Sequence, residues 1–135
     1  MNINTGVVKY VHAGHTKPIV CGANGARYVS NKKNLLMGGI EGTPYIEQEM
    51  KLSPGECLYL YTDGVIEAKN ISGELFSEKR LLGLLEENSK QIANEENNQY
   101  AESVCRLVYE DVKSYTAGAK QSDDITMLAV RYFPK

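Results

Sequence analysis

A short run of apolar and aromatic residues, Cys57 to Tyr61, constrains the fold of this chain more than any other feature. The turn sequence Ser53-Pro54-Gly55 lies before the run, and Thr62-Asp63-Gly64 follows it. A segment this short between two turn signals is typical of a strand that is buried on both faces. The run therefore predicts a central strand of a sheet.

Further strand signals come before this run. Residues 7–12 are rich in β-branched and aromatic side chains, and residues 45–52 alternate in polarity. Ala23-Asn24-Gly25 separates two more strand candidates, residues 18–21 and 26–30. Because Asn-Gly is a strong hairpin signal, these two segments are predicted to pair antiparallel.

The second half of the chain has helical spacing. Ser77 is a plausible N-cap for a helix that contains Leu81, Leu82, Leu84 and Leu85. Apolar residues across 99–115 repeat with a period near 3.6, and Gly118 is expected to end that helix. Residues 94–98 are expected to form a loop and residues 125–133 a last strand. The pattern predicts an α+β fold, a mostly antiparallel sheet packed with two helices.

Composition excludes several classes of protein. The 135 residues suit a single domain, and the 42% hydrophobic content is typical of a globular chain. A net charge of -2 argues against a general nucleic-acid binder. No apolar run is long enough to span a bilayer, and residues 1–4 do not resemble a signal peptide. The expected location is the cytoplasm.

The cysteines Cys21, Cys57 and Cys105 are far apart in the sequence. An odd number without a Cys-x-x-Cys pair is a poor disulfide framework and a poor zinc site. Each cysteine has apolar neighbours, which favours a buried thiol over a reactive one. Three unpaired cysteines also fit a reducing compartment.

The beginning of the chain predicts an open sheet edge. Asn4-Thr5-Gly6 is a turn signal, so a strand before it has at most residues 1–3. The strand at 7–12 would then lack a full neighbour, and an open edge favours pairing with another chain. We expect either a fragment of a larger domain or a partner strand from a second copy.

Two acidic segments are candidate metal sites. Asp63 follows the central strand and precedes Gly64, which leaves room for an ion to approach; an ordinary Asp-Gly turn is the alternative. Asp123 and Asp124 repel each other just before the last strand, and either a divalent cation or solvent compensates. If the strand ends converge, the carboxylates suit Mg²⁺ or Mn²⁺.

His15 lies in a turn of small residues after a strand, within His12-Ala13-Gly14-His15. An imidazole there can act as a general acid, contact a phosphate or stabilise the turn. The spacing leaves these three roles open.

Five segments in order carry a family resemblance: Tyr10-Val11-His12-Ala13-Gly14-His15, Leu36-Met37-Gly38, Leu52-Ser53-Pro54-Gly55-Glu56, Leu60-Tyr61-Thr62-Asp63-Gly64-Val65-Ile66-Glu67-Ala68 and Gln121-Ser122-Asp123-Asp124-Ile125-Thr126. The chain resembles the C-terminal part of the sporulation-type (SpoIIE/RsbU-like) branch of the PPM, or PP2C-like, protein phosphatases. The resemblance implies a partial PP2C-like β-sandwich flanked by helices.

The same resemblance implies a phosphoserine/phosphothreonine phosphatase that uses two Mn²⁺ or Mg²⁺ ions. By position, Asp63 and Asp123 would be metal ligands. Asp124 would be a ligand or a neighbour of one. Gly64 and His15 match supporting positions. The implied partner is a phosphorylated regulatory protein, such as an anti-anti-sigma factor.

One part of the family pattern is missing from residues 1–135. The family carries an earlier Gly-Asp-x-x-Gly-His-Gly-like motif whose aspartate bridges both metals, and no such motif occurs here. The resemblance therefore implies that residues 1–135 are the later part of a phosphatase domain and lack full activity alone. The alternative is a non-catalytic module that binds a partner or self-associates through its open edge.

Overall fold

A computed structural model describes residues 1–30, 32, 34–93 and 99–134 of the chain. Its main sheet has four antiparallel strands in the order β3 (Gly25–Tyr28), β2 (Ile19–Gly22), β5 (Cys57–Tyr61) and β6 (Met127–Arg131). β5 has a neighbour on each side, which confirms the predicted central strand. The hairpin at Asn24-Gly25 is also confirmed, since β2 and β3 pair directly across it.

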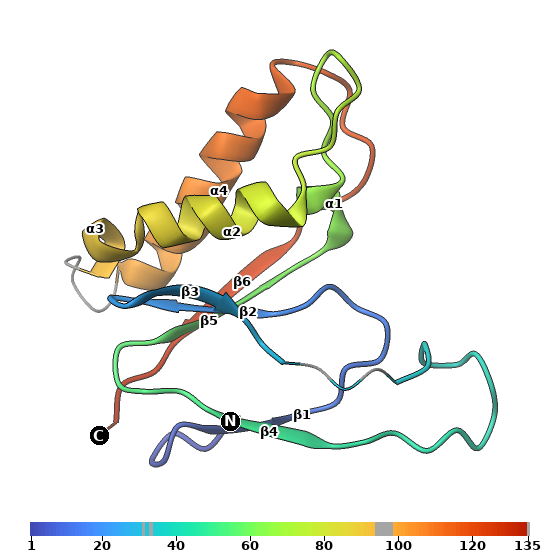
Figure 1. The fold of residues 1–135 in the computed structure, drawn as a ribbon, viewed down its shortest axis with the longest axis vertical. Helices are drawn as coiled ribbons and strands as arrows, with labels where there is room; N and C mark the ends of the chain where they lie inside the picture. The colour runs from blue at the N-terminus through green and yellow to red at the C-terminus, as the bar shows by residue number, and fades with distance from the viewer. Residues whose placement is uncertain (31, 33, 94–98, 135) are drawn as a thin grey trace.

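A second sheet contains two antiparallel strands, β1 (Val7–Tyr10) and β4 (Gln48–Lys51). Figure 1 shows three layers, with the helices on one side of the four-stranded sheet and the β1–β4 sheet on the other. The side chains buried between the two sheets are Val8, Val20, Val29, Leu52 and Tyr132. The result is the predicted α+β fold with antiparallel sheets.

β5 shows how one strand serves both layers. Its side chains alternate between faces, as the two-residue period of a strand requires. Cys57, Tyr59 and Tyr61 lie in the core under the helices, whereas Leu58 packs toward the β1–β4 sheet. An apolar run without alternation is thus explained by burial on both faces.

Two long helices cover the main sheet where the leucine and valine patterns predict them. α2 (Glu78–Glu87) begins after Ser77, whose side chain accepts a hydrogen bond from the Arg80 amide, and it buries Leu81 and Leu85. α4 (Tyr100–Thr116) buries Val104, Val108 and Val112. Ala117 and Gly118 both have positive φ and end α4.

Two short helices were not predicted. α1 (Asp63–Ile66) and α3 (Ser89–Ala93) contain four and five residues, too few to show a helical period. The loop expected at residues 94–98 lies outside the described residues. Among those that are described, no helix has the length and apolar content needed to cross a bilayer.

The expected strand at residues 1–3 does not form. The Asn2 amide instead donates to the Val7 carbonyl at 2.7 Å, and the Gly6 amide donates to the Asn2 carbonyl at 2.9 Å. The strand predicted at residues 7–12 is present as β1, and one of its edges pairs with β4 along its whole length. Its other edge has no partner strand within the described part of the chain.

Candidate functional site

Asp63 stands at the point where the central strand ends and α1 begins. Its side chain is exposed, and one carboxylate oxygen, Oδ1, accepts a hydrogen bond from the Gly64 amide at 3.1 Å. The buried strand fixes the backbone before Asp63, and buried Val65 fixes it afterwards. The carboxylate is therefore held on a rigid support at the edge of the sheet.

Thr62 ties this strand end to the segment that carries the second pair of acids. Its amide donates to the Thr126 carbonyl at 3.0 Å, and its hydroxyl accepts from the Thr126 amide at 3.0 Å. The same hydroxyl donates to the Asp124 carbonyl at 2.8 Å. The two acidic segments, which are about sixty residues apart in the sequence, therefore meet at one corner of the sheet. The sequence analysis had left this convergence of the strand ends open.

Gly64 makes this close approach possible. A Cβ atom added at this buried position would lie 2.9 Å from the Asp124 carbonyl carbon and 3.3 Å from the Asp123 carbonyl oxygen. A Cβ atom essentially never lies within 3.0 Å of a backbone atom, so a side chain here would force the two segments apart. The room that Gly64 was expected to leave for an ion is taken up by the backbone of Asp123 and Asp124.

The carboxylates of Asp123 and Asp124 are exposed beside this contact. One Asp123 oxygen accepts the Asp124 amide at 2.7 Å, and the Gln121 side-chain amide donates to the Asp123 carbonyl at 2.7 Å. None of the ion pairs within the described residues involves Asp63, Asp123 or Asp124. Three carboxylates without cationic partners leave negative charge at this corner.

His15 lies near the same end of the central strand. The Thr16 amide donates to its Nδ1 at 2.6 Å, and the Thr16 hydroxyl donates to the Tyr61 carbonyl. Thr16 therefore fastens the Ala13-Gly14-His15 turn two residues before Asp63. The exposed imidazole is bonded to its own neighbour, which is the turn-stabilising geometry among the three roles left open by the sequence.

The donor set fits a hard divalent cation in type, but the three carboxylates do not converge into one coordinating group. Carboxylate oxygens are the ligands that Mg²⁺ and Mn²⁺ prefer. Within the residues that the structure describes, however, no group of three or more His, Cys, Asp or Glu side chains could hold an ion. Asp63, Asp123 and Asp124 would need further ligands from outside this set.

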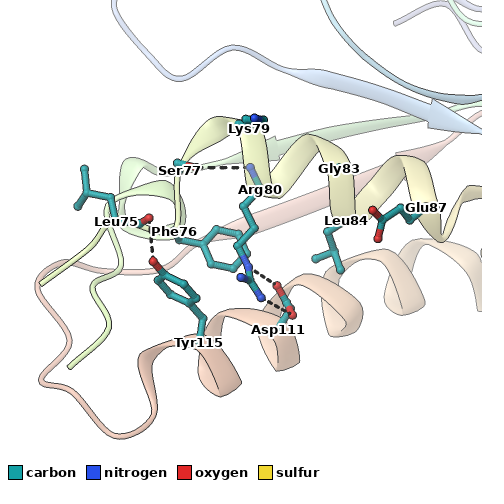
Figure 2. A pocket seen from close by; sticks show the side chains of 10 residues that line it. All are labelled: Leu75, Phe76, Ser77, Lys79, Arg80, Gly83, Leu84, Glu87, Asp111 and Tyr115. Carbon is teal, nitrogen blue, oxygen red and sulfur yellow. Dashed lines mark hydrogen bonds and ion pairs between the residues drawn. The ribbon is translucent and has the colours of Figure 1, made fainter. Parts of the chain in front are cut away.

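A groove lies elsewhere, between α2 and α4. Figure 2 shows Arg80 reaching across it to Asp111, with hydrogen bonds of 3.0 and 3.2 Å. The guanidinium also lies over the rings of Phe76 and Tyr115, at 5.2 and 4.7 Å from the ring centres. Arg80 and Asp111 pair with each other across the groove, and the other charged residues that line it are Lys79 and Glu87.

Thr62 and Thr16 are the two site residues that the sequence analysis missed. Both lie beside residues that were singled out, Asp63 and His15, but their contacts are with backbone groups far along the chain. Only the Thr62 position left a signal, because a hydroxyl beside a strand-end Asp-Gly can bond to a neighbouring strand.

Comparison with known families settles what kind of chain this is. The family model described as Stage II sporulation protein E (SpoIIE) matches residues 1–133. The chain belongs to the SpoIIE family. Protein IcfG of Synechocystis is 28% identical over 130 residues, which are 96% of this chain but 19% of IcfG.

Solved structures place the SpoIIE-family chain among PP2C domains. The SiaA-PP2C domain of Pseudomonas aeruginosa has a TM-score of 0.72 at 19% identity, over 95% of this chain and 47% of that one. The RsbU and RsbW domains of Rv1364c from Mycobacterium tuberculosis give 0.72 at 28% identity, over 97% and 35%. The manganese-presoaked phosphatase domain of SpoIIE from Bacillus subtilis gives 0.65 at 17% identity, over 98% and 54%. This chain spans about half or less of each.

Proposed function

We propose that this chain is the later part of a metal-dependent protein serine/threonine phosphatase domain. The observation that carries the proposal is the junction of Thr62, Gly64 and Asp124, which brings two acidic segments to one sheet corner. Membership of the SpoIIE family and the PP2C fold support it. The shorter length of this chain supports a partial domain.

In this proposal Asp63 and Asp123 bind divalent metal, and Asp124 lies beside them as a further ligand or a neighbour. The group is Mn²⁺ or Mg²⁺, with two ions in the complete domain; when bound, such a pair supplies an activated water for attack on phosphorus. Thr62 and Gly64 hold the two acidic segments together. The remaining ligands come from outside the described residues.

The proposed substrate is a phosphoserine or phosphothreonine on a regulatory protein, such as an anti-anti-sigma factor. The open corner supports a protein substrate, because Asp63, Asp123 and Asp124 are all exposed. We also propose a cytoplasmic location, which the three free cysteines support.

A non-catalytic module is the second candidate. The observation in its favour is the small number of ligands, since the described residues hold no group of three. Such a module would use its open strand edges to bind a partner or a second copy.

Calorimetric titration with Mn²⁺ separates the two candidates. We expect weak binding by this chain, reduced further in Asp63→Asn and Asp123→Asn, because each removes a charged oxygen donor from the corner. Asp111→Asn is the matched control, since Asp111 is engaged by Arg80 in the distant groove. Weakening in the control alone, or equal affinity in all four proteins, would contradict the site.

A further inference from the structure

The three cysteines converge in the core under the helices. Cys21 lies on β2, Cys57 on β5 and Cys105 on α4, and all three belong to the same cluster of packed side chains. Although the three cysteines are far apart in the sequence, they lie in one packed cluster in the structure. Cys21 and Cys57 are buried, and Cys105 is half-buried.

Cys21 and Cys57 directly face each other across the β2–β5 ladder. Opposed residues of antiparallel strands have Cα atoms about 4.5 or 5.5 Å apart. A disulfide needs a Cα separation of about 4.4–6.8 Å. Both side chains point to the helix side of the sheet, and Cys21 Sγ lies 3.8 Å from the Cys57 carbonyl oxygen. The backbone thus already has the spacing of a cross-strand disulfide.

The surroundings of the pair are polar for a protein core. Arg131 is the β6 residue opposite Cys57, and its guanidinium lies 3.8 Å from the centre of the Tyr100 ring. The Tyr100 hydroxyl is 4.0 Å from Cys21 Sγ. The buried Nη1 atom of Arg131 has no hydrogen-bond partner among the described residues. The Arg131 cation favours negative charge on the Cys21 sulfur.

The two thiols are not equivalent in this setting. The Cys57 side chain, together with the Tyr100 hydroxyl and the Arg131 charge, lowers the pKa of Cys21 and outweighs the opposing effect of burial. The same hydrogen bond and burial raise the pKa of Cys57. Cys21 is thus the easier of the two thiols to deprotonate, and thiol–disulfide exchange begins with attack by a thiolate.

We infer that Cys21 and Cys57 form a redox modification site, in which oxidation joins β2 to β5 through a reversible cross-strand disulfide. In a reducing compartment the pair remains as thiols, and a disulfide oxidant such as oxidised glutathione converts it. This site is separate from the acidic corner, at the opposite end of β5 from Asp63.

The reaction with oxidised glutathione balances in two exchange steps. The Cys21 thiolate attacks one glutathione sulfur, forms a mixed disulfide and expels a glutathione thiolate. Cys57 then loses its proton and attacks the Cys21 sulfur, which forms the protein disulfide and expels the second glutathione thiolate. The two protein sulfurs lose two electrons, and glutathione disulfide gains them.

Peptide mapping of the oxidised wild-type chain tests the inference. Trypsin places Cys21, Cys57 and Cys105 in three separate peptides, 10–27, 52–69 and 91–106, since Lys17 is followed by proline. The protein is incubated with oxidised glutathione in native buffer, and in urea below the unfolding transition, where local opening exposes buried thiols more often. Free thiols are then alkylated. We expect peptide 10–27 joined to 52–69, with the mass of two hydrogens lost, and complete reversal by dithiothreitol.

Single variants show which thiols react. Cys105→Ser should keep the 10–27 to 52–69 link at wild-type yield, whereas Cys21→Ser and Cys57→Ser should lose it. A link to peptide 91–106, glutathione adducts without a protein disulfide, or full alkylation of all three cysteines under both conditions would overturn the inference. Because the main readout uses the wild-type chain, misfolding of a variant does not affect it.

Discussion

Gly64 is the residue at which the two acidic segments of this chain come closest. Its missing side chain lets the Asp123 and Asp124 carbonyl groups pack against the first turn of α1. Thr62 supplies the hydrogen bonds, but Gly64 supplies the space. The geometry of the corner thus depends on a residue that has no side chain.

Replacement of this glycine should open the corner. We expect Gly64→Ala to lower the free energy of unfolding by about 1–3 kcal/mol, because the new methyl group overpacks a buried backbone contact. Urea denaturation measures this loss as a lower transition midpoint with an unchanged dependence of the free energy on urea concentration. Gly83→Ala is the matched control, since it lies within α2 with nothing near its Cβ position. It should be neutral or stabilising by up to about 1 kcal/mol. Equal stability of Gly64→Ala and wild type would contradict this role.

Single residues also show how far sequence reasoning extends. Asp63 and Asp123 could be placed at strand ends because turn and strand signals flank them. Their proximity rests on the antiparallel pairing of β5 with β6, and pairing across about sixty residues leaves no local signal. The facing of Cys21 and Cys57 was missed for the same reason.

The stability of α2 depends on its N-cap residue, Ser77. Ser77 has φ of 75°, a region that favours glycine, and its hydroxyl accepts the Arg80 amide at 3.4 Å. The residue thus combines a helix cap with an unfavourable backbone conformation.

Two substitutions separate these effects. Ser77→Ala should lower the free energy of unfolding by about 1 kcal/mol, because it removes the cap and keeps the strain. Ser77→Gly removes the same hydroxyl but relieves the backbone, so its stability should lie within a few tenths of a kcal/mol of wild type. Thermal or urea unfolding compares them. An alanine variant at least as stable as the glycine variant would show that the positive φ at residue 77 does not lower the stability of the protein.

The two long helices, the central strand and the Asn-Gly hairpin were predictable from local sequence patterns, whereas the short helices and the pairing of β1 with β4 were not. α4 was expected over residues 99–115 and begins and ends within one residue of that range, because its apolar side chains repeat through several turns. α1 is a single turn, set by the packing of Val65 after the buried strand. The partnership of β1 with β4 also depends on tertiary contacts, namely Val8 and Leu52 in the core between the sheets.

At the scale of the whole molecule, the sheets have open edges. β1 pairs only with β4, and β6 pairs only with β5, within the described part of the chain. Leu128 on β6 is 53% exposed. Unpaired backbone groups beside exposed apolar side chains favour strand addition from another chain.

Light scattering at increasing concentration tests this property. We expect the isolated chain to exceed the monomer mass at high concentration and to return to it on dilution. Leu128→Lys should reduce the association, because a charged side chain on an edge strand opposes pairing. A monomer at every concentration, or equal association by the variant, would show that this edge is not used.

Asp63 and Asp123 are proposed to belong to one metal-dependent phosphatase site. The most direct measurement is Mn²⁺-dependent release of phosphate from a phosphoserine protein by the complete phosphatase domain that contains this chain. Loss of either carboxylate should reduce turnover by about 100-fold or more, since a catalytic metal contributes several kcal/mol to the transition state. Asp63→Asn and Asp123→Asn should therefore both be inactive, while Asp111→Asn remains active. Unchanged turnover in both site variants would contradict the assignment.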